Sequence, residues 1–173
     1  MFFFITAYWS VTVKCLFWQR FPSSWRWEGR RKGLLQDSYK TLEPILNSKN
    51  ISEDLKVRFF KAYLESIYLY NSELWTLTKT LEKKVDTYQR RQLRKILGIH
   101  WPDIITNKEL YQRTKLYPWS INIFNRRMKW FGHLLRLPKT TPARKALEKF
   151  ITPTKQPIGR PKTTWLSKIL KDI

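Results

Sequence analysis

Apolar residues recur every three to four positions through most of this chain, the spacing that gathers side chains on one face of a helix. The first such stripe consists of Leu35, Tyr39, Leu42 and Leu46. It predicts a short helix over residues 34–48. Proline lacks the backbone N–H and clashes with the preceding turn, so Pro44 is expected to kink or break this helix.

The second predicted helix covers residues 53–70. Ser52 precedes it as an N-cap, and the acidic residues Glu53 and Asp54 lie where the helix dipole favours negative charge. The predicted buried stripe of this helix consists of Leu55, Phe59, Tyr63 and Ile67. A turn is expected to follow at Asn71.

A long helix comes next, with Thr78 or Thr80 as its N-cap and Gly98 as the residue that ends it. Its predicted buried face consists of Leu81, Val85, Tyr88, Leu93, Ile96 and Leu97. The remaining perimeter carries more positive charge than Glu82 and Asp86 can neutralise. The first candidate phosphate-binding face therefore consists of Lys83, Lys84, Arg90, Arg91, Arg94 and Lys95.

Further helices are predicted after Gly98. Thr106 and Glu109 have the spacing of a capping box, which predicts a helix running to about Thr114. The helix predicted over residues 119–137 has the stripe Ile121, Phe124, Met128, Phe131 and Leu135. Shorter helical segments are predicted at residues 143–150 and 163–170.

Strand patterns are nearly absent from Leu34 to the end. The chain therefore predicts an all-α fold, with a small helical bundle at residues 34–98 and a basic helical linker module at residues 99–173.

Residues 1–33 form a hydrophobic and basic N-terminal extension whose structure the pattern leaves open. Residues 1–18 are almost wholly apolar and aromatic, with Lys14 as an interruption. A signal anchor, a β-hairpin, and an extension unrelated to the rest of the chain all fit this composition.

The charge is strongly positive, with 34 lysines and arginines against 13 acidic residues and a formal net charge of +21. Residues 79–173 contain 23 of the basic residues and 6 of the acidic ones. Such an excess predicts a polyanionic partner bound mainly by the C-terminal half. Further candidate phosphate ligands are Arg126, Arg127, Lys129, Arg160 and Lys162.

Four tryptophans in the basic half are candidates for stacking on unpaired bases: Trp101, Trp119, Trp130 and Trp165. Core packing is the alternative for each of them, and it is expected for Trp130, which falls beside an apolar stripe. Trp101 and Trp119 adjoin prolines at helix junctions, where wedge or hinge roles are expected.

No catalytic, cofactor-binding or metal-binding residue is predicted. The only histidines, His100 and His133, have no neighbouring nucleophile with which to build a triad, and the acidic residues are scattered. The single cysteine, Cys15, forms no zinc cluster with them. The function expected is binding, without an enzymatic activity of this chain alone.

Several segments, taken in order, resemble the region that follows the polymerase palm in non-LTR (LINE-type) retrotransposon endonuclease-reverse transcriptases. They are residues 69–77 (LYNSELWTL), 90–98 (RRQLRKILG), 101–110 (WPDIITNKEL), 126–136 (RRMKWFGHLLR) and 159–165 (GRPKTTW). Glu73 and Trp75 match the family, whereas Asn71 replaces its usual glycine. Asparagine tolerates the left-handed conformation that such a turn requires.

The resemblance implies that residues from about 50 to 97 form a thumb that grips a template-primer duplex, followed by a linker that contacts RNA or target DNA. It also implies that the palm carboxylates and the endonuclease lie upstream of Leu34, where this chain has an unrelated start. A polymerase palm supplied elsewhere is thus a candidate partner.

The expected function is weakly sequence-specific binding of RNA, DNA or an RNA–DNA hybrid, in the nucleus or the cytoplasm. One alternative is an inactive transposon relic. A second is a membrane-anchored basic protein in which residues 1–18 insert and the positive body binds anionic lipid. A third is a chromatin factor that uses the Gly159-Arg160-Pro161 hook in the minor groove.

Overall fold

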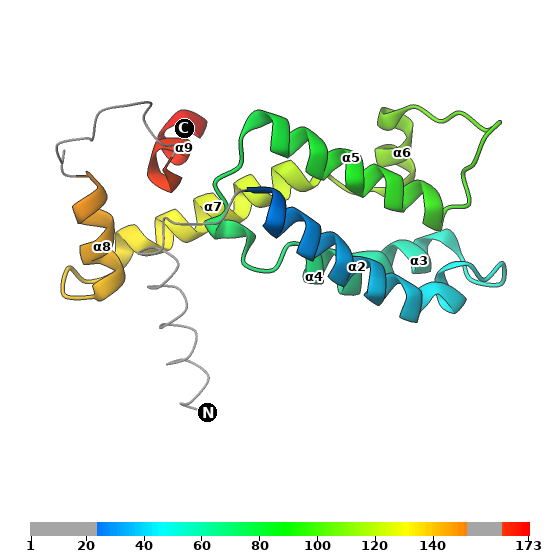
Figure 1. The fold of residues 1–173 in the computed structure, drawn as a ribbon, viewed down its shortest axis with the longest axis horizontal. Coiled ribbons are helices and arrows are strands. Elements are labelled where there is room, and N and C mark those ends of the chain that lie inside the picture. The colour runs from blue at the N-terminus through cyan, green and yellow to red at the C-terminus, as the bar shows by residue number, and fades with distance from the viewer. Residues whose placement is uncertain (1–23, 152–163) are drawn as a thin grey trace. The chain divides into compact units, whose positions relative to one another are not determined.

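The structure is a computed structural model that describes residues 24–151 and 164–173, and all regular secondary structure in these residues is helical (Figure 1). This confirms the all-α fold predicted from the apolar spacing. Among the described residues, no helix combines the length and the apolarity needed to cross a membrane. The alternatives for residues 1–18 lie outside the described residues.

The first half of the described chain is built from α2 (Ser24–Leu46), α3 (Glu53–Phe59), a π-helical segment (Phe60–Glu65), α4 (Ser66–Tyr68), a 3₁₀ turn (Ser72–Leu74) and α5 (Lys79–Ile96). The second half is built from α6 (Asn107–Thr114), α7 (Trp119–Arg136), α8 (Pro142–Ile151) and α9 (Trp165–Asp172).

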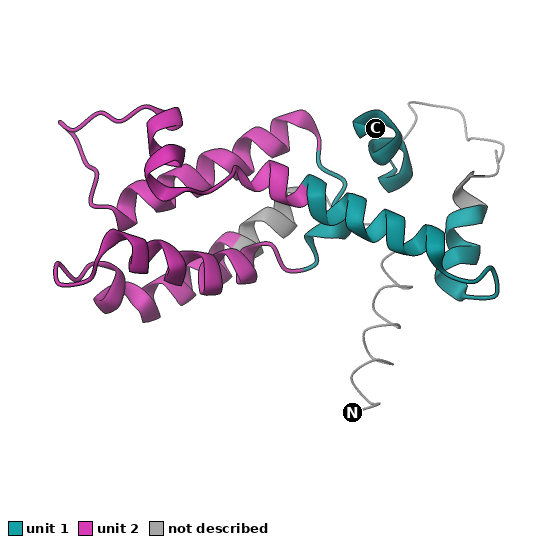
Figure 2. Ribbon diagram, turned by 180° about the vertical axis from the view of Figure 1, so that it is seen from behind, with its two compact units in different colours: residues 1–21, 71–77, 124–173 teal, residues 22–70, 78–123 magenta. Residues whose placement is uncertain are grey.

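These elements form two compact units (Figure 2). Unit 1 contains the described residues of segments 71–77 and 124–173, and unit 2 contains those of segments 22–70 and 78–123. Both units are therefore assembled from segments far apart in the sequence. The helix α7 begins in unit 2 and continues in unit 1.

Unit 2 is centred on a stack of aromatic rings. The indole of Trp119, which is fully buried, lies 4.5 Å from the ring of Tyr68 and 5.8 Å from that of Phe60, measured between centroids. α2 packs along the helical segment from Glu53 to Tyr68 and contributes Leu35 and Leu46, both fully buried. Burial of large rings and leucines supplies most of the driving force for folding.

The core of unit 1 is smaller. Leu134, Ala143, Leu147 and Leu166 form its buried cluster, and Trp130, Phe131, Leu137 and Trp165 pack against it. The indole N–H of Trp165 donates to the carbonyl of Glu73 at 2.7 Å. This bond joins α9 to the segment that leads into α5. The prediction that Trp130 packs in a core is confirmed.

The predicted helix ends at Thr78, Gly98 and Thr106 are confirmed, whereas Ser52 occupies the N-cap position of α3 without a side-chain cap hydrogen bond. Thr78 and Thr106 each accept a hydrogen bond from a backbone N–H in the first turn of α5 and α6. Gly98 has φ +68°, and Ile99 N–H donates to the Arg94 carbonyl at 2.9 Å, which is the 6→1 bond of a Schellman motif. Asn71 adopts the left-handed conformation, as its replacement of glycine predicts.

The expected break at Pro44 is wrong, because α2 continues through it to Leu46 and begins at Ser24, before the predicted start. The side chain of Pro44 lies in the last turn. A proline removes one hydrogen bond from the helix, and near the C-terminal end few residues depend on that bond.

Two predicted buried stripes are wrong in part, because only Phe59, Ile67, Met128 and Phe131 of their members are even half-buried. In the helical segment from Glu53 to Tyr68 the buried side chains are Val57, Phe60, Leu64, Glu65 and Tyr68, whereas Leu55 and Tyr63 are exposed. In α7 the buried side chains are Trp119, Ile123, Arg127 and Leu134, whereas Ile121, Phe124 and Leu135 are exposed. Both helices have apolar residues on two faces, and packing against neighbouring elements selected the face that was not predicted.

An exposed ion pair joins α3 to α6. The Nε atom of Arg113 donates to Oε2 of Glu53 at 2.9 Å, and a second bond joins Nη2 to Oε1. The hydrogen bonds from this guanidinium lower the pKa of Glu53 below its usual value. A carboxyl whose pKa is lowered by folding stabilises the folded chain at pH values above its unfolded-state pKa. This stabilisation is lost as the pH falls through the folded-state pKa.

Replacing Glu53 with glutamine is therefore expected to destabilise unit 2 only slightly at neutral pH, by about 0.2–1 kcal/mol, since both side chains are solvent-screened. The difference from the unmodified chain should vanish in acid, where Glu53 is protonated. Urea unfolding at several pH values measures this. A difference that persists unchanged in acid would show that the effect does not depend on the charge of Glu53, and so does not come from the ion pair.

Candidate nucleic-acid interface

The predicted basic face of α5 consists of two adjacent rows. Lys83, Arg90 and Arg94 form one row, and Lys84, Arg91 and Lys95 form the other, with the same spacing in both. Lys83, Arg91 and Lys95 are exposed, and the other three side chains are half-buried. The apolar side of the helix is turned inward, with Val85, Leu93 and Ile96 buried as predicted.

The second half of these rows opens onto a groove of about 780 Å³ in unit 2. Its walls come from α2, from α5, from the segment between α5 and α6, and from the first residue of α6. The residues that line it are Gln36, Tyr39, Thr87, Tyr88, Arg90, Arg91, Gln92, Arg94, Lys95, Ile99, His100 and Asn107. The structure thus brings four of the predicted cations together in one groove, and Lys83 and Lys84 lie outside its lining.

Arg94 holds one side of this groove in place. Its Nη2 atom donates to the carbonyl of Ile105 at 3.1 Å and to Oδ1 of Asn107 at 2.9 Å. The guanidinium therefore fixes the loop between α5 and α6 against the end of α5. Both bonds come from the Nη2 atom, so the Nε and Nη1 groups can still donate to a ligand. Arg94 therefore combines a structural role with a positive charge in the groove.

Lys95 and Tyr39 form the contact between α5 and α2. The Nζ atom of Lys95 lies 3.9 Å above the ring of Tyr39 and 3.8 Å from Oε1 of Glu43. Burial and the nearby carboxylate of Glu43 raise the pKa of Tyr39. The cation–π contact keeps the lysine side chain along the groove wall.

Arg90 and Arg91 complete the positive charge. The Nη2 atom of Arg90 donates to Oγ1 of Thr87, one turn earlier in the same helix, at 2.9 Å. The exposed Arg91 lies beside Tyr88, whose pKa is raised by burial and lowered by the Arg91 charge, with burial the larger effect. A phenol with a raised pKa stays protonated and can donate to a phosphate oxygen.

The groove has the chemistry of a phosphate-binding surface. None of the described residues that line it is acidic, and arginine guanidiniums match phosphate oxygens in geometry. The amides of Gln36, Gln92 and Asn107 add neutral donors and acceptors, which suit sugars or base edges. Sequence reasoning missed Gln36, Tyr39 and Asn107, because a helical pattern does not reveal which distant residue faces it.

The second predicted cationic group lies in unit 1 and is divided by the structure. Arg126 and Lys129 are exposed and border a shallow depression of about 370 Å³ with Glu73 and Trp130. Arg127 departs from the expectation, because its side chain is only 1% exposed. Residues at successive positions of a helix point in different directions, and position 127 faces the core.

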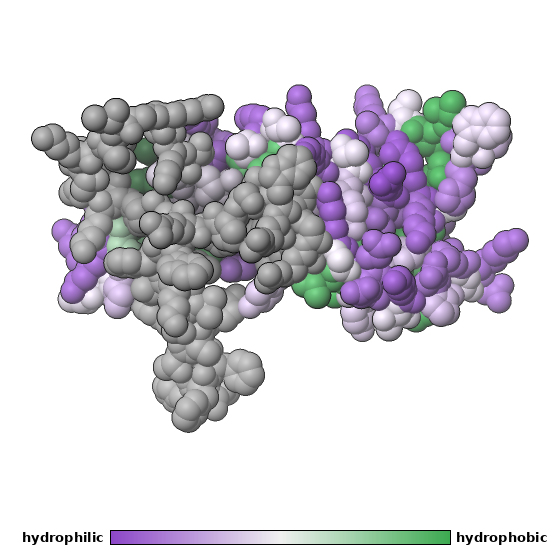
Figure 3. Space-filling view, viewed as in Figure 1, coloured by the Kyte–Doolittle hydropathy of each residue, from purple (hydrophilic) through white to green (hydrophobic). Residues whose placement is uncertain are grey.

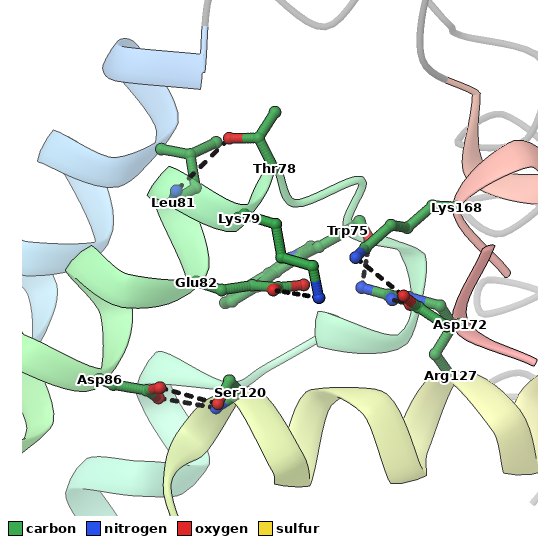
Figure 4. A network of polar contacts seen from close by, with 10 residues as sticks. All are labelled: Trp75, Thr78, Lys79, Leu81, Glu82, Asp86, Ser120, Arg127, Lys168 and Asp172. Atoms are coloured by element: carbon green, nitrogen blue, oxygen red, sulfur yellow. Dashed lines mark hydrogen bonds and ion pairs between the residues drawn. The ribbon is translucent and has the colours of Figure 1, made fainter.

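Arg127 instead forms a buried ion pair that includes α9 (Figure 4). Its Nη1 atom donates to Oδ2 of Asp172 at 2.7 Å, and its Nη2 atom donates to the carbonyl of Trp75 at 3.0 Å. Lys168 donates to the other oxygen of Asp172 at 2.9 Å. These bonds leave Arg127 unsuited to a phosphate in this conformation. Arg160 and Lys162 lie outside the described residues.

The structure separates the stacking candidates. Trp119 is fully buried in unit 2, Trp130 packs in the core of unit 1, and Trp165 is half-buried there with a bonded indole N–H. Trp101 alone among these four is exposed, with 88% of its surface accessible. The residue next to it, His100, lines the basic groove and is exposed.

His133 is exposed, and its ring lies 5.4 Å from that of Trp130. No group of three or more histidine, cysteine, aspartate or glutamate residues in the described ranges is placed to hold a metal ion.

Comparison with known proteins gives no match to any family model, and no curated protein or solved structure is significantly similar to this chain. The functional interpretation therefore rests on the groove, the distribution of charge and the sequence motifs.

Proposed function

We propose that this chain binds nucleic acid through the basic groove of unit 2. The observation that carries the proposal is the convergence of Arg90, Arg91, Arg94 and Lys95 on one groove without an acidic side chain among its described lining residues. Neutralising phosphates there would release counterions, which makes binding strong at low salt and weak at high salt.

We further propose that the chain corresponds to the non-catalytic C-terminal part of a non-LTR retrotransposon reverse transcriptase. Two of the five segments behind this resemblance contribute to the groove. Residues 90–98 supply its cations and the Gly98 helix end, and residues 101–110 supply the loop that Arg94 holds. In a complete polymerase, such a surface would hold the strand or duplex beside a palm provided by another segment.

The test measures binding of the full chain to labelled single-stranded RNA, duplex DNA and RNA–DNA hybrid over a salt series. Replacing both Arg90 and Arg91 with glutamine should weaken binding by roughly ten- to fiftyfold at moderate salt. For duplex DNA, the slope of log affinity against log salt should fall by about 0.9 for each phosphate that the variant no longer neutralises.

A matched control replaces Lys49 and Lys61 with glutamine. These lysines are exposed in unit 2 and lie outside the groove lining, so the control removes the same charge from another place. Equal reductions in affinity for the two double variants would show attraction by net charge alone and contradict the groove. A chain that folds, by circular dichroism, yet binds none of the probes would favour an inactive transposon relic.

A further inference from the structure

The loop between α5 and α6 carries two apolar side chains into solvent. Trp101 is 88% exposed and Ile104 is 87% exposed, the two highest values among the described large hydrophobic residues. Single exposed hydrophobic residues are common, but a tryptophan with this exposure leaves a large ring area in water. Burial in a core therefore does not explain the position of this ring.

The loop is nevertheless held at both ends. The Schellman motif at Gly98 fixes the end of α5, and Thr106 caps the start of α6. Between these points, the Asp103 N–H donates to the His100 carbonyl at 2.8 Å, and Arg94 holds the carbonyl of Ile105. Backbone anchoring without side-chain burial is typical of a loop that presents a residue to a ligand.

Trp101 lies on a loop that begins and ends at the basic groove. His100 and Asn107 both line the groove, so the loop that carries Trp101 leaves the groove wall and returns to it. Figure 3 shows a small hydrophobic patch in the region where Figure 1 draws this loop, bordered by hydrophilic residues. An aromatic ring beside a row of phosphate-binding cations is the arrangement that single-strand binding surfaces use.

We propose that Trp101 stacks on an unpaired base of the strand whose phosphates occupy the groove, an inference that rests on the function proposed above. In a continuous duplex the bases are stacked on one another and their faces are not accessible. The preferred substrate class is therefore single-stranded nucleic acid or a junction between a single strand and a duplex. The groove cations hold the backbone, and Trp101 selects for the unpaired base next to it.

The shape of the surface favours a nucleic acid over a lipid bilayer as the occupant. Interfacial membrane binding uses an extended amphipathic face with a row of apolar residues. Here, the cations lie inside a groove lined also by the amides of Gln36, Gln92 and Asn107, which suits an extended strand with phosphates and polar edges.

The test compares the full chain with Trp101→Ala and Trp101→Phe. Three labelled probes are used: single-stranded DNA, a blunt duplex of the same length, and a duplex with a single-stranded overhang. Tyr117→Ala is the matched control, because Tyr117 is an exposed aromatic residue of the same unit outside the groove lining.

Trp101→Ala should weaken binding of the single strand and the overhang probe by roughly tenfold or more and leave the blunt duplex within about twofold. Trp101→Phe should retain most of the affinity, and Tyr117→Ala should change none of the three. An equal decrease in affinity for all probes, or no decrease for any, overturns the stacking role even where the Arg90 and Arg91 variant still binds more weakly. In that case the proposal that the groove binds nucleic acid still holds, and only the proposed preference for unpaired bases is wrong.

Two further outcomes would also overturn the proposal. If the unmodified chain binds none of the probes, both the groove function and the stacking role are wrong. If Trp101→Ala abolishes binding to vesicles of phosphatidylserine and phosphatidylcholine without changing the affinity for any oligonucleotide, the loop is a lipid-contacting element.

Discussion

Replacing Arg127 with methionine should destabilise unit 1 by about 3–5 kcal/mol, the usual effect of removing one partner from a buried ion pair. Methionine fills a similar volume but donates no hydrogen bond. Asp172, whose side chain is only 11% exposed, would keep Lys168 but lose the 2.7 Å bond, and the Trp75 carbonyl would lose its donor. The helix α9 should then separate from the rest of unit 1 more readily.

Hydrogen exchange of the α9 amides measures this effect, because it reports on unit 1 without requiring a single unfolding transition for the whole chain. Arg126→Met is the matched control, since it makes the same substitution at an exposed neighbouring position, and it should change stability by no more than about 0.5 kcal/mol. A double-mutant cycle with Asp172→Asn should show strong coupling. Unchanged exchange in Arg127→Met would mean that the ion pair contributes nothing to holding α9.

The second large effect is expected at Gln89, a fully buried amide in the middle of α5. Its Nε2 atom donates to the carbonyl of Tyr117 at 3.0 Å. Its Oε1 atom accepts from the backbone N–H of Trp119 at 2.9 Å and from the hydroxyl of Tyr111 at 3.2 Å. One side chain thus satisfies polar groups of α6 and of the segment that enters α7.

Gln89→Leu would leave these groups without a partner, and a buried unsatisfied polar group costs about 1–3 kcal/mol. Unit 2 should be destabilised by about 2–4 kcal/mol, since partial hydration would offset some of the cost. Hydrogen exchange of the α5 and α6 amides is the measurement. Gln92→Leu, which makes the same change on a half-buried position of the same helix, should cost no more than about 0.5 kcal/mol.

An equal loss of stability in Gln89→Leu and Gln92→Leu would refute the assignment of Gln89 as the buried side chain that links α5 to α6 and α7.

The Asp86 carboxylate provides a related link, accepting from the backbone N–H of Ser120 at 2.9 Å and from its hydroxyl at 2.7 Å (Figure 4). Together, Asp86 and Gln89 fix the start of α7 against α5. Negative charge at a helix N-terminus adds a favourable dipole interaction.

The sequence by itself determined the features that depend on near neighbours in the chain. The period of apolar residues predicted the helices, and local hydrogen bonding at Thr78, Gly98 and Thr106 placed their ends. The identity of the Asn71 turn and the positive rows on α5 also follow from local composition. Each of these is fixed within a few residues, so a linear pattern contains the needed information.

Only the tertiary structure decided which face of each helix is buried. α7 and the helical segment from Glu53 to Tyr68 carry apolar residues on two faces, and packing against other elements decides which face is covered. The same cause buried Arg127 while leaving Arg126 exposed, and it placed Trp119 in a core while leaving Trp101 in solvent. Burial depends on packing between remote segments, which periodicity along one helix does not specify.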